Sequence, residues 1–171
     1  MKTLRGDYSC IPPKPGVYKW WFPKEEAVKL LCPLKLPKQL IDQIQKENIE
    51  GGEYWCLYFG IAKDLIERAK WHIAMHHSPS SVKSGYLSTL RQTLSALLGM
   101  DMSISEHAVN ALLDKCYWEW CPTGSRPAAE KEETEQLGNN DVFYPLNLQK
   151  NKKLSDEPRK TLLRLRKEHR K

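Results

Sequence analysis

The pattern of apolar and polar residues is clearest in the stretch 54–77. A short apolar and aromatic run at 54–59 ends at Gly60 and is too short for an ordinary helix, so it predicts a buried strand. Asp64 then suits a helix N-cap, and apolar residues follow at spacings of three to four positions. We therefore expect a central strand that turns through a glycine into an amphipathic helix.

Two further segments have the aromatic, β-prone composition of strands. They are 17–22, which is closed by Pro23, and 117–120, which is closed by Pro122. Together with 54–59 they predict a small, mainly antiparallel sheet of three strands flanked by helices, in the α/β (α+β) class.

Helical periodicity or helix-forming composition marks most of the remaining chain. Helices are expected at 25–31, 37–48, 87–98, 128–137 and 158–171, and another, capped by Ser103 or Ser105, should end near Leu113. The polar run 78–85 is expected to be a flexible loop. The helical segment at about 24–50 separates two strands that a tight turn could join, so it reads as a lid or specificity element rather than core.

Composition places the chain among globular proteins. With 171 residues, of which 28% are charged and 40% hydrophobic, it fits one domain with a sizeable core. No apolar leader opens the sequence, and no run approaches the roughly 18–20 apolar residues of a membrane helix, so we expect a cytoplasmic protein without membrane contact. The five cysteines are an odd number and are expected to be reduced.

The positive charge is concentrated at the C-terminus. The segment 150–171 holds ten Lys or Arg and three Asp or Glu, a balance of +7, while the whole chain carries +6. We therefore expect a domain at 1–149, with the insert at about 24–50, and a basic helix or tail at 150–171 that packs on the same domain. Such a segment commonly binds a phosphate backbone, although it is often only a solvated helix face.

The order of several residues resembles the GIY-YIG nuclease superfamily. The sequences GVY at 16–18 and LYFG at 57–60 look like the two halves of the motif, with Phe in the second half. Arg68 and His72 follow, four residues apart on one helix face, and Asn147 lies in a Tyr-Pro-Leu-Asn sequence; the family has a helix arginine, often with a histidine four residues later, and an asparagine near a Pro-x-Asn.

Two longer segments extend the resemblance. SGYLSTLRQTLSALL at 84–98 and YPLNLQKN at 144–151 are similar to a bacterial subgroup of GIY-YIG domain proteins. The resemblance spans most of residues 16–166. It implies a metal-dependent endonuclease that hydrolyses phosphodiester bonds of DNA.

The resemblance also implies roles for individual side chains. The implied catalytic residues are Tyr18, Tyr58, Arg68, His72, Glu133 and Asn147. An arginine can bind two phosphate oxygens at once and stabilise the charge that hydrolysis adds to the transition state. One of the two tyrosines, aided by His72, would orient or deprotonate the attacking water, and Asn147 would position the site.

The metal ligand has to be chosen among several glutamates. Glu133 is preferred, because it shares one helix face with the apolar anchors Ala129 and Leu137. Its carboxylate would hold Mg²⁺ (or Mn²⁺), which uses few protein ligands and keeps several waters. Glu135 and Glu130 are the alternatives.

The lysines at 63, 70 and 83, with the basic tail, are expected to contact the DNA backbone. Two other interpretations stay open. One is a catalytically weak or inactive nucleic-acid-binding module of the same fold. The other is a zinc protein that uses His72, His76 and cysteines. His76 and His77, at the helix end, are expected to be capping or surface residues.

Overall fold

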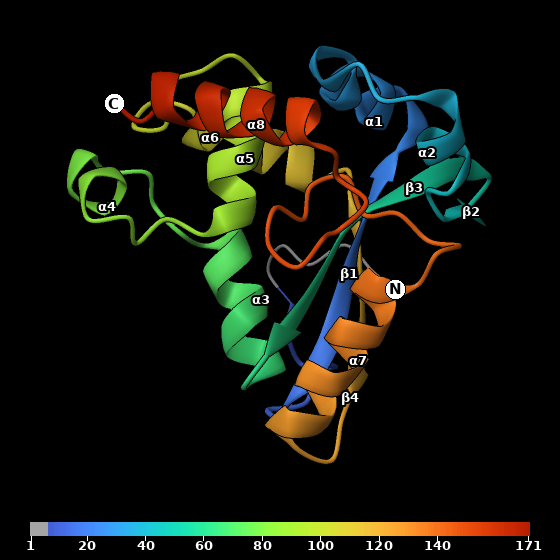
Figure 1. Ribbon diagram of the computed structural model, residues 1–171. Helices are drawn as coiled ribbons and strands as arrows, with labels where there is room; N and C mark the ends of the chain where they lie inside the picture. Colours follow the sequence, from blue (N-terminus) through green and yellow to red (C-terminus); the bar gives the residue numbers. More distant parts are fainter. Residues whose placement is uncertain (1–6) are drawn as a thin grey trace.

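A four-stranded antiparallel sheet organises the protein. The structure is a computed structural model that describes residues 7–171, and Figure 1 shows the sheet passing through the middle of the molecule. The strands are β1 (Gly16–Pro23), β2 (Lys46–Ile49), β3 (Gly52–Ala62) and β4 (Tyr117–Pro122), in the spatial order β2-β3-β1-β4. Each neighbouring pair is antiparallel. The predicted α/β class with an antiparallel sheet is confirmed, but the prediction of three strands is wrong.

The additional strand is β2, which lies in a segment expected to be helical. Helix α2 (Lys38–Asp42) lasts only five residues, and β2 then pairs with β3 as a hairpin. The turn contains Glu50 at φ +50° and Gly51 at φ +83°, the left-handed pair that a two-residue hairpin turn needs. This glycine therefore marks a hairpin turn and not the end of a helix.

Helices surround the sheet. Besides α2 they are α1 (Lys24–Leu31), the 3-10 turn η1 (Cys32–Leu34), α3 (Leu65–Ile73), α4 (Pro79–Lys83), α5 (Thr89–Leu97), α6 (Glu106–Leu113), α7 (Arg126–Gly138) and α8 (Asp156–Glu168). The predicted cap of α3 is confirmed, because the Asp64 side chain accepts a hydrogen bond from the Glu67 N–H at 3.0 Å. Helix α4 lies in the stretch expected to be a loop, and the Ser78 side chain caps it.

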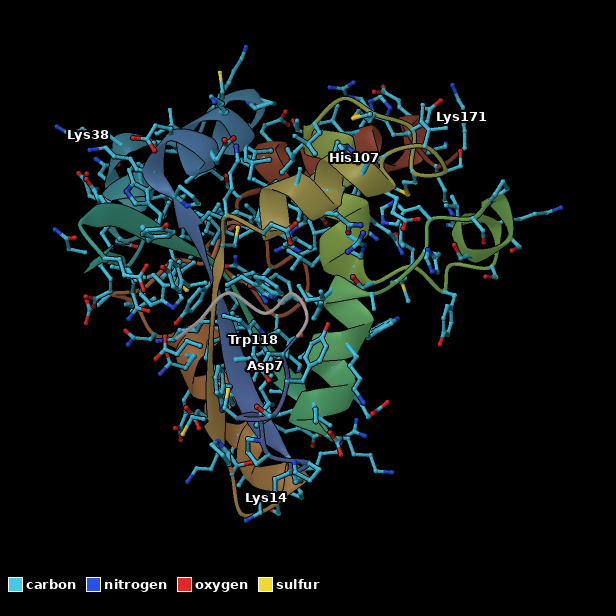
Figure 2. The ribbon with its side chains drawn as sticks, turned by 180° about the vertical axis from the view of Figure 1, so that it is seen from behind. Asp7, Lys14, Lys38, His107, Trp118 and Lys171 are labelled. Carbon is cyan, nitrogen blue, oxygen red and sulfur yellow. The ribbon has the colours of Figure 1, made fainter. Side chains whose placement is uncertain are left out.

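The two faces of the sheet bury two separate cores. Helix α7 lies in front of the sheet in Figure 1, and its Ala129 and Leu137 pack with Val17 and Phe59. The opposite face carries the larger core, to which α1, α3, α5, α6 and α8 contribute apolar side chains. Figure 2, seen from that side, shows Trp118 of β4 near the middle of the molecule, where it is completely buried.

The segment between β1 and β2 belongs to the larger core. Ala27, Leu30, Leu34 and Ile44 are each at most 3% exposed and are part of that cluster. The interpretation of this segment as a lid outside the core is therefore wrong. Its apolar residues complete the hydrophobic face that the sheet presents.

The C-terminal helix also packs on this body. Leu162 of α8 is fully buried in the larger core, and the His169 carbonyl accepts a hydrogen bond from the Met102 N–H at 2.8 Å. The five cysteines are free thiols. Among residues 7–171, no helix has the length and apolar character needed to cross a membrane.

Candidate active site

The two motif tyrosines lie on neighbouring strands and point to the same face of the sheet. Tyr18 of β1 pairs in register with Gly60 of β3, and Trp20 pairs with Tyr58. The rings of Tyr18 and Tyr58 have centroids 6.2 Å apart. Tyr18 is buried, whereas Tyr58 is half-buried and reaches a surface cavity. Tyr18 therefore lies in the interior of the protein, behind Tyr58, which borders the cavity.

Both motif glycines are required by close packing around these strands. A Cβ on Gly60 would lie 2.5 Å from the Tyr18 hydroxyl oxygen, which is far inside van der Waals contact. A Cβ on Gly16 would lie 2.5 Å from the Cys121 carbonyl oxygen of β4. The glycine of the second motif half thus makes room for the tyrosine of the first half.

A chain of hydrogen bonds runs from the sheet into the helices. The Tyr18 hydroxyl contacts His72 Nε2 at 2.9 Å, and His72 Nδ1 contacts Ser88 Oγ at 3.2 Å. Ser88 is the N-cap of α5, where its Oγ accepts the Arg91 N–H at 3.2 Å. The three side chains of this chain are at most 2% exposed. They form a buried relay behind Tyr58.

The contacts of the relay are compatible with two proton arrangements. Ser88 Oγ accepts the Arg91 N–H and can either donate to His72 Nδ1 or accept from it, because a hydroxyl has one hydrogen and two acceptor lone pairs. The direction of the hydrogen bond between His72 Nε2 and the Tyr18 hydroxyl reverses between the two arrangements. In the one in which Ser88 donates, His72 donates to the Tyr18 oxygen, and the Tyr18 hydrogen is available to Tyr58, with which Tyr18 interacts.

The directions of the pKa shifts favour loss of a proton from Tyr58 over loss from Tyr18. Burial, with the charges of Arg68 and Arg91, lowers the pKa of His72 well below its usual value, so the imidazole is neutral. Burial and the neighbouring Tyr58 raise the pKa of Tyr18 well above its usual value. Burial raises the pKa of Tyr58 too, but Arg68 and the Tyr18 hydroxyl oppose the rise. Tyr58 is therefore the better placed of the two phenols to lose a proton.

Arg68 lies on α3, one helical turn before His72. It is half-buried, and its guanidinium stacks on the Trp71 ring at 4.5 Å from the centroid. Its charge acts on Tyr18, Tyr58 and His72, so it faces the site predicted from the motif. Stacking on Trp71 fixes the orientation of this planar cation.

A cavity of about 310 Å³ opens in front of Tyr58. Its lining residues include Tyr58, Thr89, Arg126, Glu130, Glu133, Asn147 and Lys150. The Glu133 side chain is 14% exposed and forms an ion pair with Lys150 at 2.6 Å. Glu130 also lines the cavity and pairs with Arg126 at 2.9 Å, whereas Glu135 is 65% exposed and pairs with Lys131 outside it. Of the three candidate glutamates, Glu133 and Glu130 face Tyr58.

Asn147 reaches the same cavity from the segment after α7. Its side-chain oxygen accepts the Phe59 N–H at 2.9 Å, and its amide nitrogen donates to the Phe59 carbonyl at 2.7 Å. The Leu146 N–H donates to the Leu57 carbonyl at 3.0 Å. This segment thus pairs with the edge of β3 beyond β2 and fixes the strand on both sides of Tyr58.

Three residues of the site were not found from the sequence. The helical spacing of leucines begins at position 87 and so conceals Ser88, although a serine before an apolar helix is a capping signal. Lys150 and Arg166 lie in a basic run whose composition does not distinguish them from its other cations. Arg166 lies one turn after the buried Leu162 on α8, and its charge lowers the pKa of Tyr58, against the larger effect of burial.

The three predicted lysines and the two histidines at the end of α3 do not line the cavity in front of Tyr58. Lys63 and Lys70 line a larger groove beside Arg68, while Lys83 does not line it. His76 is exposed and contacts Glu106 at 3.0 Å, as a surface residue would. His77 is only 4% exposed and accepts the Arg91 Nε–H at 2.7 Å, so its assignment to the surface is wrong.

The zinc interpretation finds no cluster to support it. Within residues 7–171, no group of three or more His, Cys, Asp or Glu side chains is arranged to hold a metal ion. Both ring nitrogens of His72 are engaged in the relay, and the His76 ring is bonded to Glu106. These two histidines therefore do not form a ligand pair.

Comparison with known proteins gives one result. A model of the GIY-YIG catalytic domain matches residues 16–168, which is nearly the whole chain. A search among curated proteins and a search among solved structures returned no match.

Proposed function

The chain belongs to the GIY-YIG catalytic domain family, whose members are generally endonucleases, and on this basis we propose that it is a metal-dependent endonuclease that hydrolyses DNA phosphodiester bonds. The observation that carries the proposal is the convergence of Tyr58 and Glu133 on one cavity. Arg68 lies beside them, and the buried relay ends at the Tyr58 oxygen. These are the groups that hydrolysis of an anionic ester requires.

Tyr58 is the group that handles the proton of the attacking water. A phenol with a free pKa near 10 is a weak base at neutral pH, so the phenolate needs stabilisation. The Tyr18 hydroxyl, itself held by His72, donates to the Tyr58 oxygen and stabilises the phenolate when the proton leaves. Arg68 contributes positive charge in the same place. Tyr18 and His72 therefore act through Tyr58.

Arg68 binds the phosphate and stabilises the transition state. Its planar guanidinium can donate two parallel hydrogen bonds to phosphate oxygens and stabilise the additional charge of the transition state. Stacking on Trp71 leaves less conformational freedom to be lost when the phosphate binds. Asn147 supports the site indirectly, because it holds the backbone of the residue after Tyr58.

The donor set of the cavity fits a hard divalent cation. Glu133 and Glu130 offer carboxylate oxygens, and Mg²⁺ or Mn²⁺ is commonly bound through one or two carboxylates with several waters. When bound, such an ion polarises the phosphate and neutralises the leaving oxygen. Glu133 is already paired with Lys150, so its carboxylate must exchange the ammonium group for the ion.

Supercoiled plasmid and structured oligonucleotides, incubated with and without Mg²⁺, test the proposal. We expect cleavage that depends on Mg²⁺, and a loss of about 100-fold or more in the Glu133→Gln variant, which keeps the size of the side chain but removes its charge. Glu135→Gln is the matched control, because it removes a carboxylate from the same helix outside the cavity. Intact substrates under all conditions would contradict the proposal.

The alternative is a binding module with weak or absent hydrolysis. The ion pair between Glu133 and Lys150 favours it, since this pair leaves the preferred metal ligand neutralised. A binding module would retain its DNA affinity in the Glu133→Gln variant and would show no metal-dependent cleavage in the unmodified protein. The same plasmid experiment therefore separates the two functions.

A further inference from the structure

A second, larger hollow lies next to the proposed active site, between helices α3 and α4. This α3–α4 groove has a volume of about 1000 Å³, at the upper end of the roughly 300–1,000 Å³ of ligand sites. Its lining residues include Lys63, Arg68, Lys70, Trp71, Met75 and Tyr86. In Figure 1, α4 stands away from the body of the molecule on two connecting segments. None of the residues that line the smaller cavity lines this groove.

Two aromatic rings form the apolar part of the groove. Tyr86 is 68% exposed, which is unusual for an aromatic side chain, and its ring centroid lies 6.4 Å from that of the half-buried Trp71. Ala74 and Met75 add apolar surface beside them. An exposed ring of this kind offers a flat face on which a planar ligand can stack.

Basic side chains lie around these rings. Arg68 lies over Trp71, and Lys63 and Lys70 line the same groove. Two acidic residues line it as well: Asp64 caps α3, and Glu67 pairs with Lys70 at 3.3 Å, which offsets the charge of that lysine. Arg68 and Lys63 are therefore the cations that can bind a phosphate in the groove. The groove therefore combines a stacking surface with cations, which is the combination that binds single-stranded nucleic acid.

Arg68 connects the groove to the chemistry. It lines the groove, and its charge also acts on Tyr18 and Tyr58, so a phosphate held by Arg68 lies at the junction of both sites. A nucleotide next to the cleaved phosphate would therefore place its base beside Trp71 and Tyr86. In an intact duplex the base faces are covered by stacking, and only an unpaired base can lie on a protein ring.

We propose that the α3–α4 groove binds an unpaired nucleotide next to the scissile phosphate, with its base stacked on Tyr86, so that the substrate is DNA with a single-stranded stretch. This inference rests on the proposed nuclease function and specifies its substrate class. Lys63 contacts the backbone of the bound strand, and Tyr86 selects for the unpaired base.

Binding measured without metal tests the inference separately from cleavage. Fluorescence anisotropy in EDTA would compare a single strand of about 12 nucleotides, the same strand with abasic positions, and the matching duplex. We expect Tyr86→Ala to weaken binding of the single strand about tenfold, and Tyr86→Phe to stay within about twofold because the ring is kept. Ile104→Ala, at another exposed apolar residue outside the groove, is the matched control and should change nothing.

The abasic strand provides the second criterion. Tyr86→Ala should not weaken it further, since it has no base to stack, and the duplex affinity should change by less than about twofold. A single-strand affinity that Tyr86→Ala leaves unchanged, or an equal loss for duplex and single strand, would overturn the inference. The binding assay contains EDTA and therefore does not depend on cleavage. Plasmid cleavage that persists in the Glu133→Gln variant would refute the proposed mechanism and leave the binding result unaffected.

Discussion

Gly60 lacks a side chain because Tyr18 occupies the space that a Cβ would take. The same kind of close approach, with the Cys121 carbonyl of β4, excludes a side chain at Gly16. These two positions link the halves of the motif physically, since the glycine on β3 permits the position of the tyrosine on β1. The pair in register, Tyr18 with Gly60, is therefore one structural unit.

The contribution of Ser88 to activity can be measured separately from its contribution to stability. Ser88→Ala removes both the hydrogen-bond partner of His72 Nδ1 and the cap of α5. Loss of a cap costs about 1 kcal/mol of unfolding free energy, while loss of the hydroxyl removes the contact that orients the His72 ring. We expect cleavage of plasmid to fall about tenfold in the variant.

Ser125→Ala provides the control for this prediction. Ser125 caps α7 by accepting the Ala128 N–H at 3.3 Å, without contact to the relay. Both variants should lose a similar amount of stability in chemical denaturation, and Ser88→Ala alone should lose activity. Equal activity in the two variants would show that Ser88 is only a cap.

At the scale of elements, the end of α3 is locked to α5 and α6 by a buried polar cluster. Arg91 of α5 is fully buried, and it donates from Nε to His77 and from its terminal nitrogens to the His72 carbonyl and to Asn110 of α6. His77 Nδ1 contacts the Met102 carbonyl at 2.8 Å. Because this nitrogen carries the hydrogen, His77 Nε2 is free to accept from Arg91, and the imidazole is neutral.

This cluster predicts a loss of stability in weak acid. Burial and the charge of Arg91 lower the pKa of His77 from its ordinary 6.5 to about 4. Between these two values the unfolded chain binds a proton that the folded protein does not, so the unfolding free energy decreases as the pH falls. His77 alone should contribute a decrease of up to about 3 kcal/mol between pH 7 and pH 4, measured by chemical denaturation.

His77→Gln identifies the source of this pH dependence. Glutamine keeps one acceptor and one donor group but does not titrate in this range. The stability of the variant should therefore decrease less steeply in acid, with a residual slope from His72, whose pKa is also lowered by burial. The same steep slope in both proteins would exclude His77 as the titrating group.

Residues 146 and 147, in the segment after α7, complete the backbone pairing of β3. β2 covers only the first part of β3, and beyond it the backbone of Leu57 and Phe59 is paired by residues 146 and 147. An unpaired strand edge next to the site would be open to other chains and less rigid. The Asn147 side chain thus replaces a neighbouring strand at Phe59, the residue after Tyr58.

At the scale of the whole molecule, the basic segment joins the site instead of forming a separate tail. Lys150 pairs with Glu133 in the cavity, and Arg166 acts on Tyr58 from α8. Arg170 donates to the carbonyl of Val82 in α4, so the C-terminal end lies beside the α3–α4 groove. The positive charge of 150–171 therefore extends from the cavity to the groove.

The salt dependence of DNA binding measures which cations are used. Replacing Lys63 and Lys70 by alanine should weaken binding of the single strand at low salt and reduce the slope of log K against log salt by about 0.7 for each phosphate that the variant no longer neutralises. The control replaces Lys160 and Lys167, which are exposed on α8 and line neither the cavity nor the groove. An equal reduction of the slope in both double variants would mean that binding is not centred on the groove.

Local sequence determined the parts of the protein that depend on near neighbours. The aromatic runs predicted β1, β3 and β4, the aspartate at 64 predicted the start of α3, and the motif order predicted the family. Each of these features is set within one strand or one helical turn, where side-chain periodicity and capping act directly.

Only the tertiary structure decided the features that depend on distant segments. It showed β2 as a fourth strand, because a weakly helical segment gains more from pairing with β3 and burying Ile44 than from extending α2. It separated Glu133, which faces Tyr58, from Glu135, which faces solvent on the same helix. It also buried His77 against Arg91, and it ended the relay from Ser88 at Tyr58. Packing between elements far apart in the chain fixes these interactions, and no local pattern in the sequence records it.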